Sequence, residues 1–408
     1  MKLVHAADLH VDSPVAGMHD APGLRDHAHH ATRRALTNLV ELCLSEDARL
    51  LLLAGDLFDG SWRDFGTGLF FAQELSRLRD IGCRVVIVRG NHDAESVVSR
   101  KLRLADHVHE LSTAAPETFV LEHLGVAVHG QGYRTRATRD DLAAGYPSPI
   151  SGALNVGLLH TSLDGRPGHE PYAPTQRATL VSRGYDYWAL GHVHTREVVD
   201  RAPYVVFPGN IQGRHVNETG PKGATVLDVS GASIVSVEHR SLDVLRFGKL
   251  GLRVERDDGL DELLERARQG IETELEASEG RPLVVRVTLE GTLGARLQRE
   301  ARRLEEELRL FVASEHGARV TVERVRMRAV EDTRERASIV SPPTEDELAA
   351  EQNDLLADLA ELERRLPPEA RKRVESVRDE LVVSAMERAR ARVSAETSGA
   401  SVADEGEP

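Results

Sequence analysis

The sequence predicts an α/β fold in which two sheets pack against each other. Runs of Val, Ile and Leu at residues 2–7, 49–54 and 84–89 alternate with helical patterns, as in β-α-β units. Later apolar runs are more closely spaced, so we expect mixed or antiparallel pairing there; these runs are 118–121, 126–129, 154–159, 187–190, 204–207, 224–229 and 233–238. Two packed sheets accommodate that many strands.

The pattern changes near residue 245, which indicates a second domain. Strands and helices then alternate over a short stretch, predicted at 250–255, 260–276, 282–289, 292–313 and 318–326. Beyond Pro342 and Pro343 lie two charged helical stretches, 344–365 and 368–395. We therefore expect an N-terminal domain at 1–245, an α+β domain at 246–330, a helical segment at 331–395 and a disordered, low-complexity tail at 396–408.

Composition narrows the functional classes. The chain has 408 residues and a formal net charge of -14, which argues against a surface that coats nucleic acid non-specifically, although a local basic groove stays open. Two cysteines provide no disulfide framework, which favours a reducing compartment. Because no run of 18 apolar residues occurs, we expect a cytoplasmic protein with no membrane association.

Metal-capable side chains follow five of the predicted strands. They are Asp8 and His10, Asp56 and Asp59, Asn91 with His92 and Asp93, His160, and His192 with His194. Carboxyl ends of strands converge at one edge of an α/β sheet. Each motif alone occurs often by chance as a helix or turn cap, but five of them at strand ends indicate one metal site.

The residue types also indicate which metals would bind. Carboxylates combined with imidazoles suit Mn, Fe or Zn better than Mg or Ca, which prefer oxygen ligands. Two such ions can clamp the attacking and leaving oxygens of a phosphoryl transfer, and a carboxylate between them offsets their repulsion. Asp56 is the candidate bridge.

Taken in order, these motifs resemble those of the calcineurin-like metallophosphoesterase superfamily. Within it, HAADLHVDSP, GDLFD, GNHD, GHVH and FPGNIQGRHVNETGPKG are similar to the SbcD-like DNA repair exonucleases, in particular their YhaO-like branch. The resemblance covers residues 1–245 well and the remainder only in outline. It implies a four-layer α/β/β/α sandwich, with the α+β domain as a cap.

The resemblance also implies residue roles. One metal, most simply Mn²⁺, would be held by Asp8, His10, Asp56 and His194, and a second by Asp56, Asn91, His160 and His192. After in-line attack on phosphorus, His92 would protonate the leaving oxygen or stabilise its charge, and Asp93 would orient His92. Asp59 stands where some relatives have His, which leaves its role in DNA placement open.

The loop after residues 204–207 offers candidate substrate contacts. Asn210 and Arg214 lie in it, and an arginine can bind phosphate with two parallel hydrogen bonds. The alternative is a surface turn stabilised by Asn and Gly.

The implied reaction is hydrolysis of DNA phosphodiesters, from an end or within hairpins and single strands. The implied partner is an SMC-like coiled-coil ATPase of the SbcC or YhaN kind, docked on residues 344–395, and a homodimer stays open. Two alternatives remain. The chain could hydrolyse cyclic nucleotides or other small phosphodiesters, or it could be a non-catalytic metal-binding subunit of a repair complex.

Overall fold

The computed structural model describes residues 1–16, 28, 30–59, 65–96, 102–165, 172–255, 258–293, 295–328 and 330–331. It separates into two compact units. The first comprises Met1–Val254, Asp258–Gly291 and Glu300–Arg328, and the second comprises Glu255–Asp257, Thr292–Arg299 and Ala329–Pro408. The predicted helices at 344–365 and 368–395 and the predicted tail at 396–408 lie outside the described residues.

The first sheet is mixed and carries the first three predicted strands at its centre. In spatial order it consists of β12 (Ser233–Ser241), β11 (Gly223–Ser230), β1 (Lys2–Ala6), β2 (Ala48–Ala54), β3 (Arg84–Val88) and β4 (Val108–Glu110). Strands β1 to β4 are parallel, whereas β11 pairs antiparallel with both β1 and β12. The crossovers include helices α2 (Ala31–Ser45) and α3 (Phe65–Ser76).

The second sheet is also mixed. Its order is β5 (Glu117–Leu121), β6 (Val126–Gly130), β7 (Leu154–His160), β8 (Tyr187–Gly191), β10 (Tyr204–Phe207) and β9 (Glu197–Arg201). Strands β6, β7, β8 and β10 are parallel, and the edge strands β5 and β9 are antiparallel to their neighbours. Helix α6 (Arg177–Ser182) precedes β8.

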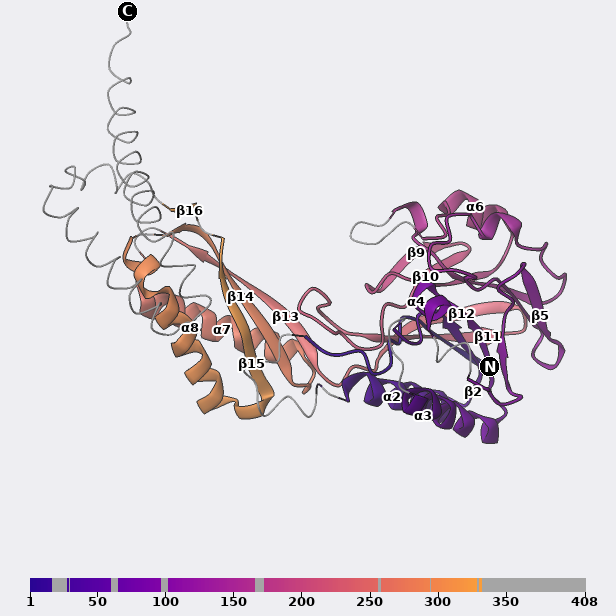
Figure 1. Ribbon diagram of the computed structural model, residues 1–408, viewed down its shortest axis with the longest axis horizontal. Coiled ribbons are helices and arrows are strands. Elements are labelled where there is room, and N and C mark those ends of the chain that lie inside the picture. The colour runs from indigo at the N-terminus through magenta and orange to yellow at the C-terminus, as the bar shows by residue number, and fades with distance from the viewer. Residues whose placement is uncertain are drawn as a thin grey trace, which may run out of the picture. The chain divides into compact units, whose positions relative to one another are not determined.

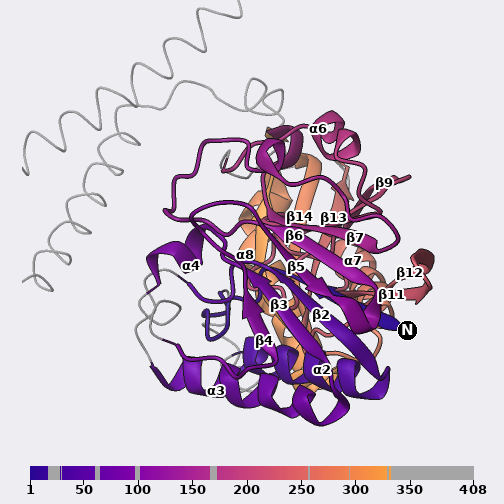
Figure 2. The same ribbon diagram turned by 90° about the vertical axis from the view of Figure 1, so that its right-hand side faces the viewer.

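Alternating side chains of these strands build three successive cores. Leu51, Leu53 and Val85 point toward helices α2 and α3, where Cys43 and Cys83 are also buried. Their neighbours Leu52 and Val86 point the other way and pack against Val128 and Val156 of the second sheet. The far side of the second sheet packs Trp188 against Leu180 of α6. The order is therefore helix, sheet, sheet, helix, as predicted (Figure 2).

Residues 246–331 contain two β-α-β units. Strands β13 (Arg246–Val254), β14 (Leu283–Leu293) and β15 (Val320–Met327) are parallel, and β16 (Val330–Glu331) pairs with the end of β14. Helices α7 (Leu260–Ala277) and α8 (Ala295–Glu315) connect them and lie along one face of the sheet (Figure 1), as right-handed crossovers require. Phe247 and Val284 pack against Val216 of the N-terminal domain.

In the described part of the chain, the remaining helical segments are short: α4 (Asn91–Glu95) and the 3₁₀ turns Arg77–Ile81, Glu122–Leu124, Ala143–Gly145, Leu163–Gly165 and Gly317–Arg319. Among the described residues, no helix is both long enough and apolar enough to cross a membrane.

Candidate metal centre

The predicted ligands follow the carboxyl ends of strands in both sheets. From the first sheet, Asp8 and His10 follow β1, Asp56 follows β2, and Asn91 begins α4 after β3. From the second sheet, His160 is the last residue of β7, and His192 and His194 follow β8. Most of these side chains are buried, with exposed fractions of 7% or less for Asp8, His10, Asp56, Asn91, His160 and His192.

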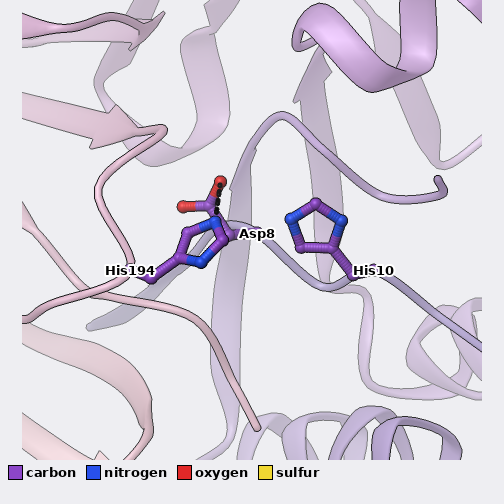
Figure 3. Close-up of side chains that lie close together, drawn as sticks. All are labelled: Asp8, His10 and His194. Atoms are coloured by element: carbon purple, nitrogen blue, oxygen red, sulfur yellow. Dashed lines mark ion pairs between the residues drawn. The ribbon is translucent and has the colours of Figure 1, made fainter. Parts of the chain in front are cut away.

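One group of potential ligand atoms lies where the two sheets meet. Asp8, His10 and His194 each offer a ligand atom within 4.8 Å of the other two (Figure 3). The His194 Nε2 atom lies 3.8 Å from Asp8 Oδ1, and the His10 Nε2 atom lies 3.9 Å from Asp56 Oδ2. These spacings leave room for a cation between the side chains.

A second group shares residues with the first. Asp8, Asp56 and His160 also offer three ligand atoms within 4.8 Å of one another. The His160 Nε2 atom lies 3.5 Å from Asp56 Oδ2 and 3.0 Å from Asn91 Oδ1. The His192 ring lies 5.1 Å from the His160 ring, centroid to centroid. The two groups share Asp8, and Asp56 Oδ2 lies 3.9 Å from His10 Nε2 of the first group and 3.5 Å from His160 Nε2 of the second. The bridging role of Asp56 remains a prediction.

Hydrogen bonds orient three of the imidazole rings. His10 Nδ1 lies 2.7 Å from Asp59 Oδ1, His194 Nδ1 lies 2.6 Å from Glu218 Oε1, and His160 Nδ1 lies 2.9 Å from the carbonyl oxygen of Ala54. Each acceptor holds a proton on Nδ1 and leaves the Nε2 lone pair toward the centre. This is the usual arrangement of metal-binding histidines, whose second nitrogen donates to a carboxylate or carbonyl group.

The electrostatics of the centre fit divalent cations. Burial, followed by repulsion from Asp56, raises the pKa of Asp8 well above its ordinary value. Burial and the nearby charge of Arg214 lower the pKa of His10 to about 4, so that its ring stays neutral. Within the described residues, His10 Nε2 is buried without a hydrogen-bond partner. Neutral imidazoles facing buried carboxylates form a donor set suited to metal ions.

The backbone bends sharply at this centre. Asp8, His10, Asp56 and His192 adopt positive φ angles of 52°, 42°, 53° and 99°, a region that residues other than glycine rarely occupy. Such conformations cost on the order of 1–3 kcal/mol each and persist at functional sites. Gly90 permits another close approach, because a Cβ atom there would lie 2.2 Å from Asp56 Oδ1. The bends turn side chains at neighbouring strand ends toward one point.

His92 lies at the rim of the centre. Its side chain is 33% exposed, its ring centroid lies 5.1 Å from that of His10, and its Nδ1 atom lies 3.5 Å from Asp59 Oδ1. Its backbone N–H donates to Asp56 Oδ1 over 2.9 Å. A partly exposed imidazole beside buried ligands is well placed to meet a substrate.

Asp93 is placed differently. Its carboxylate is buried and accepts hydrogen bonds from the backbone N–H groups of Leu57, Phe58 and Gly90 over 3.0–3.2 Å. Burial and repulsion from Asp56 raise its pKa to about 7. Asp93 thus ties the loop after β2 to the loop after β3. Its orientation of His92 remains a prediction.

The two candidate substrate contacts occupy different positions. Asn210 is fully buried and donates to the Gln212 carbonyl oxygen (2.8 Å) and to Glu218 Oε2 (3.0 Å). The Arg214 side chain lies beside the centre, with Nη2 3.4 Å from His194 Nδ1 and Nη1 3.7 Å from Asp59 Oδ1. Contact of either residue with a substrate remains a prediction.

Sequence reasoning missed Glu218. It lies in the segment FPGNIQGRHVNETGPKG but belongs to no metal motif, because its carboxylate supports a histidine instead of facing the centre. The only available signal was an acidic residue in the loop that already carried the candidate residues Asn210 and Arg214.

Comparisons with known proteins assign the class. The family model for calcineurin-like phosphoesterases matches residues 1–196, and that for the middle domain of metallophosphoesterase YhaO matches residues 247–330. The chain belongs to the calcineurin-like metallophosphoesterase family. It is 34% identical over 297 residues to the uncharacterized metallophosphoesterase YhaO of Bacillus subtilis (strain 168), covering 72% of each chain.

More distant relatives are named for DNA repair. The DNA double-strand break repair protein Mre11 of Methanopyrus kandleri is 28% identical over 52% of this chain and 48% of its own length. The Mre11 of Sulfolobus acidocaldarius is 20% identical over 72% and 76%. Among solved structures, a dimetal phosphatase from Danio rerio aligns with 59% of this chain and 96% of its own, at 12% identity and a TM-score of 0.37.

Proposed function

We propose that this protein is a two-metal-dependent nuclease that hydrolyses DNA phosphodiesters, acting from an end, in DNA repair. The observation that carries the proposal is the placement of His92, a partly exposed imidazole that forms a third group of potential ligands with His10 and Asp59, beside the two groups that include Asp8. A site that bound metals only for structure would not need it. The names of the Mre11 relatives support DNA as the substrate.

The predicted ligands have distinct tasks in this mechanism. His10 and His194 with Asp8 would hold one cation, His160 and His192 with Asn91 would hold the other, and Asp56 would contribute to both. When bound, the two cations, for which we propose Mn²⁺, supply Lewis acidity toward the phosphate and the attacking water. His92 donates a proton to the leaving oxygen. Asp93 keeps the loops after β2 and β3 together, so that His92 and Asp56 remain in register.

A basic sheet face supports DNA as the substrate in spite of the net negative charge. The face of the β13–β15 sheet opposite α7 carries exposed Lys249, Arg324 and Arg326, whereas Arg286, between them in register, is paired with Glu323. Leu250 faces α7, because a Cβ atom on Gly270 of that helix would lie 2.5 Å from the Leu250 side chain. Its neighbour Lys249 therefore points to the opposite face of the sheet. Such a row of cations suits a phosphate backbone.

The test compares wild type with His92→Ala, using Mn²⁺, end-labelled duplex DNA and a bis-nitrophenyl phosphodiester. We expect DNA cleavage to fall by about 10²–10⁴-fold at unchanged Mn²⁺ content. The loss should be smaller on the nitrophenyl substrate, whose leaving group needs little protonation. His123→Ala, an exposed histidine in the turn after β5, is the matched control.

Three results would count against parts of this proposal. A parallel loss of activity and Mn²⁺ would assign His92 to metal binding. Cleavage of the small phosphodiester alone by wild type would leave a phosphodiesterase of small substrates. Each lost phosphate contact should lower the slope of log K against log salt concentration by about 1. A Lys249→Gln, Arg324→Gln, Arg326→Gln variant that cleaves DNA with the parental salt dependence would therefore show that the basic face does not contact DNA.

We further propose an SMC-like ATPase partner that docks on residues 344–395 in the cytoplasm. Deleting residues 342–408 should then abolish co-purification with that ATPase and spare hydrolysis of the small phosphodiester. Retained co-purification would contradict this docking segment.

A further inference from the structure

We propose that Asp59, Arg214 and Glu218 form a positioning bridge that fixes both histidines of one metal group and places His92 relative to them. The inference rests on the proposed two-metal function. It assigns to these three side chains an indirect role, exerted through His10, His194 and His92.

Glu218 is itself tightly held. Its Oε1 atom lies 2.6 Å from His194 Nδ1, and its Oε2 atom accepts from the backbone N–H of Arg214 (2.7 Å) and from Asn210 Nδ2 (3.0 Å). The residue is only 6% exposed. Although burial acts in the opposite direction, His194 and Arg214 hold the pKa of Glu218 well below its usual range. A charged, immobilised carboxylate leaves the His194 ring little freedom to rotate.

Asp59 contacts His10 in the same way as Glu218 contacts His194. Its Oδ1 atom lies 2.7 Å from His10 Nδ1 and 3.5 Å from His92 Nδ1. A single carboxylate oxygen therefore faces both a proposed metal ligand and the proposed proton donor. Moving Asp59 would change the angle of the His10 ring and the position of His92 together.

Arg214 lies between these two carboxylates. Its Nη1 atom is 3.7 Å from Asp59 Oδ1 and 3.2 Å from Ser13 Oγ, and its Nη2 atom is 3.6 Å from Glu218 Oε1. The guanidinium side chain is 16% exposed. Without a cation between them, two carboxylates in so enclosed a place would repel each other. The planar fork of arginine can face both at once, which a lysine cannot do.

The direction of the hydrogen bond at His194 Nδ1 depends on which neighbour this nitrogen contacts. His194 Nδ1 lies near both Glu218 Oε1 at 2.6 Å and Arg214 Nη2 at 3.4 Å. Since an Nδ1 that carries a proton cannot also accept one, the shorter contact decides. His194 Nδ1–H donates to Glu218, and His194 Nε2 faces Asp8. Arg214 interacts electrostatically with Glu218.

The bridge joins segments that are far apart in the sequence. Asp59 follows β2 of the first sheet, whereas Arg214 and Glu218 lie in the loop between β10 and β11. His10 and His194 come from different sheets, so nothing in either sheet alone fixes their separation. We infer that the bridge sets this separation and thereby the affinity of one of the two metal positions.

The experiment is calorimetric titration of the metal-free protein with Mn²⁺ alone, so that its outcome does not depend on any nuclease assay. Arg214→Gln should weaken one of the two binding events by about 10–100-fold and leave the other unchanged, as loss of support behind metal-binding histidines generally does. Arg214→Lys should restore part of the affinity. Arg240→Gln removes an exposed arginine that pairs with Glu238 and is the matched control.

Glu218→Gln and Asp59→Asn extend the test. Each should weaken the same binding event, and the Arg214→Gln, Glu218→Gln double variant should lose less than the sum of its parts, because both changes break one network. Glu218 also supports its loop, so folding of that variant is checked by circular dichroism, and Arg214→Gln carries the test if it unfolds.

Parental Mn²⁺ binding at both positions in Arg214→Gln would overturn the bridge. If the KM of this variant for a phosphodiester were also raised, Arg214 would be a direct substrate contact. A wild type that binds two Mn²⁺ ions but hydrolyses no phosphodiester would remove the proposed function and leave the bridge standing.

Discussion

Replacing Gly90 by alanine should disable the metal centre through a single methyl group. The backbone at Gly90 has φ -88° and ψ -171°, which alanine adopts without strain. The effect is therefore steric. The new Cβ atom would lie 2.2 Å from Asp56 Oδ1 and 2.6 Å from Asp56 N, more than 1 Å closer than an ordinary contact to the carboxylate.

The expected magnitude follows from what must move. Asp56 is 2% exposed, and its Oδ1 atom accepts the His92 backbone N–H over 2.9 Å, so neither partner can yield freely. Inserting a methyl group into such packing typically lowers the free energy of unfolding by about 1–3 kcal/mol. A displaced Asp56 would disturb both metal positions, and we expect Mn²⁺ affinity to fall by at least about 10-fold at each.

The assay pairs urea denaturation with Mn²⁺ titration. Gly251→Ala is the control, because a Cβ atom there meets nothing within 4 Å. That variant should be neutral or slightly stabilised, since alanine restricts the unfolded chain. Parental Mn²⁺ affinity in Gly90→Ala would refute the conclusion that close packing behind Asp56 holds the centre in shape.

Two further outcomes are expected. Burial lowers the pKa of His5 to about 3 where its ring contacts Tyr187 and the Leu190 carbonyl oxygen, so the folded state resists protonation that the unfolded chain accepts below pH 6.5. The free energy of unfolding should thus have its full value above that pH and be lower by about 2 kcal/mol at pH 5. In denaturation experiments, His5→Asn should not show this part of the loss. Removing divalent ions with a chelator should lower the melting temperature, and Mn²⁺ at 100 times its Kd should restore about 2.7 kcal/mol of stability; a melting temperature indifferent to Mn²⁺ would contradict a metal site in the folded state.

Much of the fold could be predicted from apolar runs, and the strands that were not predicted were missed for physical reasons. Strands with continuous buried runs, such as LLLLA at the end of β2, stand out because both faces of the strand are covered. Strand β4 has only three residues, all half-buried, and β9 is a half-buried edge strand with charged residues at three of five positions. Neither has an apolar run to reveal it.

Residue type and strand position together predicted which candidate side chains would lie close to one another. The structure brings Asp8, His10 and Asp56 together because they follow the neighbouring parallel strands β1 and β2, and His160 joins them from β7 of the second sheet. It could not be read from sequence that Asp59 faces His10 and His92, or that Glu218 supports His194. These contacts depend on loop conformations and on positive φ angles, which local sequence patterns do not encode.

The division of the ligands between two sheets has a consequence for how the protein matures. Asp8 is synthesised 186 residues before its partner His194, and β1 acquires its neighbour β11 later still. A partly synthesised chain therefore holds only fragments of the centre. Loading with metal must await a nearly finished N-terminal domain, so hydrolytic capacity emerges only in molecules whose two sheets have already met.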